Sequence, residues 1–147
     1  MDNAIITAIR SNKLFEPRAI AAVIATETSG RGFDSKTGKI IIRFEPNHFN
    51  LLSKQPIAST NQNSQQDSWD IFNKAYAINK EAAMQATSIG LGQILGINYK
   101  MIGYKSVDEM WDDAKTGIPA QVNQLIRYIN SRPVLAKAIK KHSSVRI

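Results

Sequence analysis

The sequence predicts a mainly α (α+β) fold with one small β element in its first third. Apolar residues recur at three- and four-residue intervals through most of the chain, and helix-capping residues precede these intervals. Only one short segment is rich in β-branched residues. The 147 residues, 43% of them hydrophobic, suit one domain around one core, so we expect residues 1–147 to form a single domain.

Two helices are predicted to open the chain. Asp2 or Asn3 can cap the first helix, because a short polar side chain accepts a hydrogen bond from a free N–H of the first turn. Pro17 suits the first position of the second helix, where its missing N–H needs no partner. The second helix is expected to stop at residues 29–32, Ser-Gly-Arg-Gly, since two glycines so close favour a turn.

A short β-branched segment follows these helices. Residues 39–45, KIIIRFE, predict a strand, and residues 34–38 a turn before it, so we expect a small β-hairpin after the second helix. A short helix is expected over residues 47–53, after Pro46. Residues 54–66 lack apolar periodicity and are rich in Ser, Asn and Gln, which predicts a mobile surface loop.

The rest of the chain is predicted to be helical, with one glycine-rich interruption at residues 87–96, TSIGLGQILG. The expected helix starts are Asp67 or Ser68, Asn79, the capping box at 106–109, Pro119 and Pro133. We expect the last helix to run to about Lys141.

The charge and the cysteine count restrict the function. A net charge of +7 and a pI of about 9.8 favour polyanionic partners, namely nucleic acid, anionic lipid or anionic cell wall. The sequence has no RNA-binding, zinc-finger or phosphate-loop signature. It also has no cysteine, which excludes disulfides and thiolate zinc sites. Two histidines are too few for a histidine-rich metal site, so we expect no metal and no cofactor.

The beginning of the sequence does not resemble a secretory signal. It starts with an acidic residue, and its apolar run is broken by Thr7 and Arg10. No stretch approaches the roughly 18 apolar residues that a membrane span needs. We therefore expect synthesis in the cytoplasm without a signal peptide, so a substrate outside the cytoplasm would require a separate route of release.

Glu27 is the most informative residue. It follows Val23 and Ile24 at helical spacing, on a face that we expect to be buried. A carboxyl group at the edge of an apolar core loses hydration, which favours its protonated form, as a general acid requires. The alternative, which helical spacing alone favours, is an exposed glutamate at a helix end, paired with Arg31.

Four ordered blocks of sequence resemble the phage-type N-acetylmuramidase family of endolysins, within the lysozyme-like superfamily. The first block contains Glu27-Thr28-Ser29-Gly30, and the last contains Ser-Ile-Gly-Leu-Gly-Gln followed by Asn-Tyr. A weaker likeness continues through residues 103–107, so the resemblance covers most of the chain. The four blocks are residues 22–33, 40–45, 76–79 and 88–99.

The resemblance implies a lysozyme-like catalytic domain that cleaves the β-1,4 bond between N-acetylmuramic acid and N-acetylglucosamine, and so lyses bacteria. It implies that Glu27 is the catalytic acid. It also places four further residues in the sugar cleft: Ser29, Gly90, Leu91 and Gln93. Glycines let a backbone approach a sugar closely, and Gln93 offers both a donor and an acceptor, although simple helix packing also uses glycine. Gly92 departs from the Met or Phe that is commoner there, which puts a hydrophobic sugar contact in doubt.

Glycoside hydrolysis usually needs a second carboxylate, and Glu45 and Asp34 are the candidates. Glu45 is favoured because it ends the predicted strand, but it could instead pair with Arg43, Lys39 or a helix N-terminus. For Asp34, a turn-forming role is favoured. Lytic transglycosylases, which form 1,6-anhydromuramic ends, need no second acid. The choice between the two reactions therefore depends on Glu45.

Three further residues are candidate sugar contacts. Asn98 and Tyr99 follow the glycine turn, and Tyr76 joins an apolar ring to a polar tip. Tyr76 also completes an apolar stripe with Trp69 and Phe72, so core packing is the favoured role for it.

We expect peptidoglycan as the partner, no nucleic acid, a monomer, no separate wall-binding domain, and action on the wall in the periplasm after release. The last sixteen residues, from Arg132, hold five basic residues and no acid. They predict either a solvated closing helix, which is favoured, or a segment that docks on anionic outer-membrane lipid. Two other functions stay open. A basic nucleic-acid-binding helical domain would leave Glu27 and the glycine turn unexplained, and an inactive module would bind sugar without cutting it.

Overall fold

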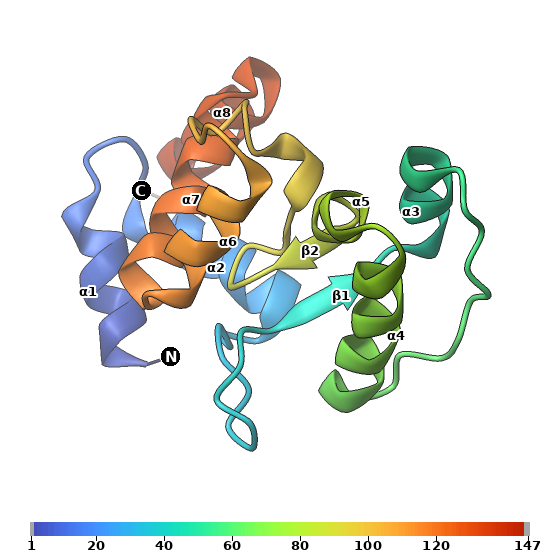
Figure 1. Cartoon of the computed structure of the whole chain (residues 1–147). Coiled ribbons are helices and arrows are strands. Elements are labelled where there is room, and N and C mark those ends of the chain that lie inside the picture. Colours follow the sequence, from blue (N-terminus) through green and yellow to red (C-terminus); the bar gives the residue numbers. More distant parts are fainter. Residues whose placement is uncertain (1, 146–147) are drawn as a thin grey trace.

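The computed structural model describes residues 2–145, with side chains through Lys141. Within this part of the chain, eight α-helices and three short strands follow one another (Figure 1). One group of helices, α1, α2, α6, α7 and α8, lies on one side of a small sheet, and α3, α4 and α5 lie on the other (Figure 1). The predicted mainly α fold is confirmed.

The first group begins with α1 (Asn3–Ser11) and α2 (Pro17–Thr28), which start where the sequence predicts. The Oδ1 atom of Asp2 accepts the N–H of Ala4 at 2.7 Å and so caps α1. The same group contains α6 (Val107–Lys115), α7 (Ile118–Asn130) and α8 (Pro133–Val145). The predicted inward face of α7 is buried, and it consists of Val122, Leu125, Ile126 and Ile129.

The hairpin that the sequence predicts after the second helix is present, and the sheet extends beyond it. A bridge between Phe33 and Ile40 closes the turn between them, but β1 (Ile42–Phe44) pairs with β2 (Thr87–Ile89), far along the chain. The third strand, β3 (Ile94–Leu95), pairs with β2, so the order is β1-β2-β3 and all pairs are antiparallel. The glycine-rich segment therefore forms a hairpin of its own. A strand as short as β1 needs further strands and helices to be stable.

The second group consists of α3 (Pro46–Ser53), α4 (Gln65–Ile78) and α5 (Lys80–Gln85), and a single 3-10 turn, η1 (Gly96–Asn98), follows β3. The predicted start of α4 at Asp67 or Ser68 is wrong, because Ser64 caps the helix by accepting the N–H of Asp67 at 3.1 Å. The predicted cap of α5 is confirmed, since Oδ1 of Asn79 accepts the N–H of Ala82 at 3.0 Å.

The end of the predicted mobile loop is fixed to the sheet. The side-chain amide of Gln62 accepts the N–H of Phe44 at 2.9 Å and donates to the carbonyl of Phe44 at 2.8 Å. The amide of Gln65 does the same with Ile42, at 2.9 Å in both directions. Each amide pairs as a neighbouring strand would, and so covers the free edge of β1. We call these two residues the glutamine clasp. The expectation of a loop that is mobile throughout residues 54–66 is therefore wrong at its end.

Aromatic rings join the two helix groups. Phe72 of α4 stacks on Trp111 of α6 with ring centroids 4.9 Å apart, and Trp69 meets both rings edge-on. Tyr76 extends the stripe, but 41% of its surface is exposed. No helix within residues 2–145 combines the length and the apolar character that crossing a membrane requires.

Candidate active site

Glu27 lies in the last turn of α2, and the end of that helix explains its position. Ser29 ends the helix in the left-handed conformation (φ 56°), and Gly30 also has a positive φ (81°). The chain turns away directly after Glu27, so Ile24 is fully buried while Glu27 is exposed. The expected burial of Glu27 is therefore wrong. Its alternative partner, Arg31, forms no ion pair with it in the described part of the chain.

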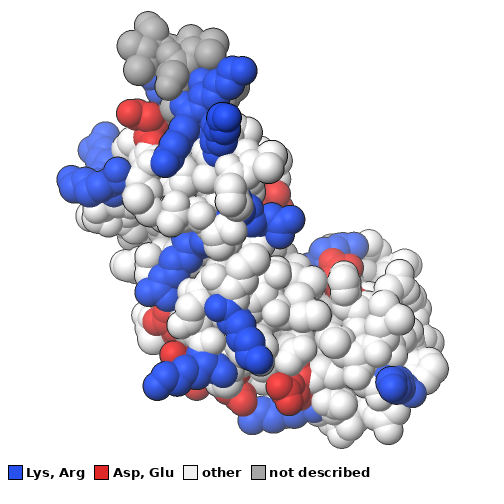
Figure 2. Space-filling model, turned by 90° about the horizontal axis from the view of Figure 1, so that it is seen from above, with Lys and Arg blue, Asp and Glu red and all other residues white. Residues whose placement is uncertain are grey.

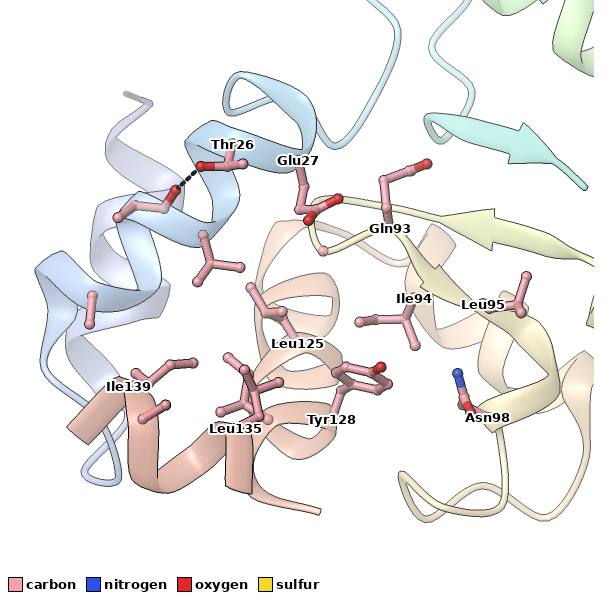
Figure 3. Close-up of a pocket in the computed structure, with 16 residues that line it drawn as sticks. Thr26, Glu27, Gln93, Ile94, Leu95, Asn98, Leu125, Tyr128, Leu135 and Ile139 are labelled. Atoms are coloured by element: carbon pink, nitrogen blue, oxygen red, sulfur yellow. Dashed lines mark hydrogen bonds between the residues drawn. The ribbon is translucent and has the colours of Figure 1, made fainter. Parts of the chain in front are cut away.

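Two cavities meet at Glu27. The first, which we call the apolar cavity, has a volume of about 790 Å³ and lies between α2, α7, α8 and the segment that follows Gly92. Figure 3 shows Glu27 and Gln93 on one side of this cavity, away from Tyr128, Leu135 and Ile139. Among the described residues that line it, Glu27 alone is charged.

The second cavity, which we call the polar cavity, has a volume of about 900 Å³. Its lining includes Ser29, Arg31, Asp34, Lys36, Arg43 and Gln66. Among the described residues, Glu27 and Gln93 line both cavities. We call these two adjoining cavities, which share the exposed Glu27 in their lining, the cleft.

The glycine turn presents Gln93 to this cleft. Gly90 has a φ of 72°, and Gln93 adopts the left-handed region (φ 48°), which is uncommon for a residue with a side chain. The Nε2 atom of Gln93 donates to the carbonyl of Gly90 at 3.0 Å and to that of Ile41 at 3.4 Å. Its Oε1 atom is therefore the polar atom left to meet a substrate, and it can only accept a hydrogen bond.

Behind the cleft, the fully buried amide of Gln121 joins several segments. Its Oε1 accepts the N–H of Leu91 at 2.9 Å, and its Nε2 donates to the carbonyls of Ala114 at 3.0 Å and Gly32 at 3.4 Å. A Cβ atom on Gly32 would lie 2.4 Å from Oε1 of Gln121, and one on Gly90 would lie 3.0 Å from it. Close packing against Gln121 therefore explains these glycines without a sugar. Sequence reasoning missed Gln121, although its position four residues before Leu125 places it on the apolar face of α7.

The candidate sugar contacts separate into two groups. Ser29, Gln93 and Asn98 line the cleft, whereas Gly90 and Leu91 are buried behind it, with Leu91 0% exposed. A direct side-chain contact between Leu91 and a sugar is therefore excluded in this conformation.

The two tyrosine candidates also lie outside the lining of the cleft. Tyr99 is half-buried, with Nζ of Lys100 5.9 Å from its ring centre. Tyr76 lines a separate cavity with Trp69 and Trp111. The structure thus brings neither tyrosine to Glu27.

The two candidate second carboxylates also differ in position. Glu45, which the sequence favours, lines neither cavity, and its Oε1 lies 3.7 Å from Nε of Arg43, as in the ion-pair alternative. Asp34 lines the polar cavity with Glu27, and its Oδ2 accepts the hydroxyl of Thr37 at 3.1 Å. Asp34 thus forms the predicted turn and also lies in the cleft. The geometry favours Asp34 over Glu45 because only Asp34 shares a cavity with Glu27.

The arrangement suits general acid chemistry at one carboxyl group. In the described part of the chain, no three His, Asp or Glu side chains gather closely enough to hold a metal ion. If a substrate occupies both cavities, the exposed carboxyl group between them can reach one of its atoms and transfer a proton to that atom.

Comparison with known proteins decides the family. The family model described as "Muramidase: N-acetylmuramidase" matches residues 16–147. The chain belongs to the N-acetylmuramidase family. The part that matches contains both cavities, and only the segment with α1 precedes it.

The fold of this N-acetylmuramidase resembles that of a solved structure, "Crystal structure of Burkholderia AP3 phage endolysin". The TM-score is 0.79 and the sequence identity is 20%, over 99% of this chain. The chain spans 61% of the length of that endolysin. At this identity the likeness concerns the fold, and the expected lysozyme-like fold is confirmed. No match was found among curated proteins.

Proposed function

We propose that this N-acetylmuramidase cleaves the β-1,4 bond between N-acetylmuramic acid and N-acetylglucosamine in peptidoglycan and lyses bacteria as an endolysin. The observation that carries this proposal is the position of Glu27, with Gln93, where the two cavities meet. A glycan strand that runs through both cavities has one glycosidic oxygen beside the Glu27 carboxyl. That oxygen is the atom that must receive a proton when the bond breaks.

In the proposed mechanism, protonated Glu27 donates its proton to the leaving glycosidic oxygen as the bond between that oxygen and the anomeric carbon breaks. The anomeric carbon gains positive charge, so an ionised carboxylate nearby stabilises the transition state or activates the attacking water. Asp34 is the proposed second carboxylate, because it lines the polar cavity with Glu27. The Oε1 atom of Gln93 would accept a hydrogen bond from a sugar hydroxyl or an acetamido N–H.

Mass spectrometry of digested peptidoglycan tests the reaction. Hydrolysis at the proposed bond leaves reducing N-acetylmuramic acid ends. The alternative, lytic transglycosylation, leaves 1,6-anhydromuramic ends. Reducing N-acetylglucosamine ends would contradict both reactions, because both cleave the bond that leaves N-acetylmuramic acid at the new end.

We also propose that exposed basic residues of α8 bring the enzyme to anionic lipid at the outer membrane. Lys137, Lys141 and the 86% exposed Val134 support this proposal, and Figure 2 shows Lys and Arg spread widely over one face of the molecule. Leu135 and Ile139 line the apolar cavity, so α8 also closes the fold. The basic segment predicted from the sequence extends to Arg146, which lies outside the described residues. Co-sedimentation with phosphatidylglycerol vesicles should weaken in a Lys137→Gln/Lys141→Gln variant, and unchanged binding would contradict the proposal.

A further inference from the structure

We propose that the polar cavity binds the peptide side chains of peptidoglycan through their carboxylates, so that the enzyme prefers peptide-bearing glycan over bare glycan. This inference rests on the function proposed above and names the substrate class that the same cleft selects. It starts from the contrast between the two cavities. Within residues 2–141, Glu27 is the one charged residue that lines the apolar cavity, whereas three cationic side chains line the polar cavity.

The three cations are Arg31, Lys36 and Arg43, and their pairing differs. Arg43 lies 3.7 Å from Glu45, which partly neutralises it. Arg31 and Lys36 form no ion pair with any described carboxylate. The other charged residues of the lining are Glu27 and Asp34. When Glu27 holds the proton that the reaction requires, three positive charges face one negative charge.

These cations belong to three separate segments, and hydrogen bonds fix the backbone of each segment. The N–H of Arg31 donates to the carbonyl of Thr28 at 3.3 Å. Lys36 lies in the turn that Asp34 closes, where the N–H of Asp34 donates to the carbonyl of Lys39 at 2.8 Å. Arg43 belongs to β1, whose edge the glutamine clasp covers. The charged groups therefore project from fixed backbone, which lowers the entropy cost of binding an anion.

The chemistry of the substrate matches this charge distribution. In peptidoglycan the lactyl carboxyl group of N-acetylmuramic acid is held in an amide bond to the peptide, so where a peptide is attached the free carboxylates belong to the peptide. Arg and Lys form charge-assisted hydrogen bonds with carboxylates. An ionised group in the apolar cavity would lose hydration without gaining a partner. We therefore infer that the peptide next to the cleaved bond leaves the cleft through the polar cavity.

The test uses two substrates and two charge-matched variants. Soluble glycan strands are prepared with their peptides intact. A second batch is treated with an amidase that removes the peptides, and the lactyl carboxylates that this exposes are then capped as methylamides. The measured quantity is the ratio of kcat/KM on the first substrate to kcat/KM on the second. The Arg31→Gln/Lys36→Gln variant removes the two unpaired cations of the polar cavity. The control, Lys13→Gln/Lys105→Gln, removes two exposed cations outside both cavities.

We expect this ratio to fall roughly five- to thirtyfold in Arg31→Gln/Lys36→Gln, the equivalent of a modest electrostatic contact per cation. The control variant has the same net charge as Arg31→Gln/Lys36→Gln, and it should keep the wild-type ratio. The same ratio in all three proteins would overturn the inference, and so would an equal fall in the control, which would indicate general attraction. Equal unfolding midpoints in the wild type and both variants would exclude a folding defect. Wild-type protein that releases no reducing ends from either substrate would instead overturn the proposed function itself.

Discussion

At the scale of single residues, the exposure of Glu27 depends on how its helix ends. Ser29 adopts a left-handed conformation and ends α2 at Thr28, one residue after Glu27. The N–H of Ser29 donates the last hydrogen bond of the helix, to the carbonyl of Ala25 at 3.1 Å. Thr28, the next residue, is buried and its Oγ1 lies 3.2 Å from the carbonyl oxygen of Leu91, which holds the helix end against the glycine turn.

The first prediction concerns this glutamate. We expect Glu27→Gln to fold normally, because Glu27 is exposed and no described ion pair involves it. The amide keeps the shape but cannot deliver a proton, so turnover should fall by about 10²- to 10⁴-fold. Release of reducing ends from peptidoglycan and the unfolding midpoint check this. Turnover above about a tenth of the wild-type value would exclude Glu27 as the general acid.

The second prediction separates the two further carboxylates. Asp34→Asn should lower kcat strongly, since Asp34 shares the polar cavity with Glu27. Glu45→Gln should keep most activity, because its carboxylate lines neither cavity and meets Arg43 instead. Rates on peptidoglycan are measured beside melting temperatures, because Asp34 also holds its turn through Thr37. A fully active Asp34→Asn protein would leave Glu27 as the only acid that the mechanism needs.

At the scale of elements, the glutamine clasp connects α4 to the sheet. Gln65 lies in the first turn of α4, so the amide that covers β1 also joins the start of this helix to the sheet. The same residues line the polar cavity, and the clasp therefore forms part of the wall of the cleft.

The third prediction tests this connection. In Gln65→Glu the carboxylate can still accept the N–H of Ile42, but it can no longer donate to the carbonyl of Ile42. We expect the free energy of unfolding to fall by about 1–3 kcal/mol, the cost of an unpaired polar group that is partly buried. Urea unfolding measures this. Gln55→Glu, at an exposed site, adds the same charge and should change little; an equal loss in both variants would indicate a charge effect alone.

Across the whole molecule, one tyrosine connects three segments of the first helix group, which contains α6 and α7. Tyr104 lies before α6, its hydroxyl donates to the carboxylate of Asp113 in α6, and it accepts from Nε2 of Gln124 in α7 at 3.1 Å. Burial, followed by the hydrogen bond to Asp113, raises the pKa of Tyr104 to about 12.

The fourth prediction follows from this raised pKa. In the unfolded chain a tyrosine ionises near pH ~10, so between pH ~10 and about 12 the unfolded state loses a proton that the folded state keeps. The stabilisation by Tyr104 is therefore complete below pH ~10 and is lost as the pH rises through this window. Urea unfolding at pH 9 and pH 11 should show a smaller alkaline loss in Tyr104→Phe than in wild type. Equal losses would show that Tyr104 is not responsible.

Local sequence signals are enough to predict the helices and to place Glu27 on one of them. Asp2, Pro17 and Ser106 mark helix starts because a cap depends on residues within four positions. Four ordered motifs were also enough to indicate the family that the comparison confirms.

Which side chains meet depends instead on how distant segments pack in the folded chain. The pairing of β1 with β2 joins residues more than forty positions apart, and no local pattern encodes it. The roles of Gln62 and Gln65 depend on where the edge of β1 lies, and their polar segment looks like an ordinary loop in the sequence. The proposal of Asp34 in place of Glu45 depends on which carboxylate lines a cavity together with Glu27. Helix caps act over a few residues, whereas a cleft is formed by packing between distant segments.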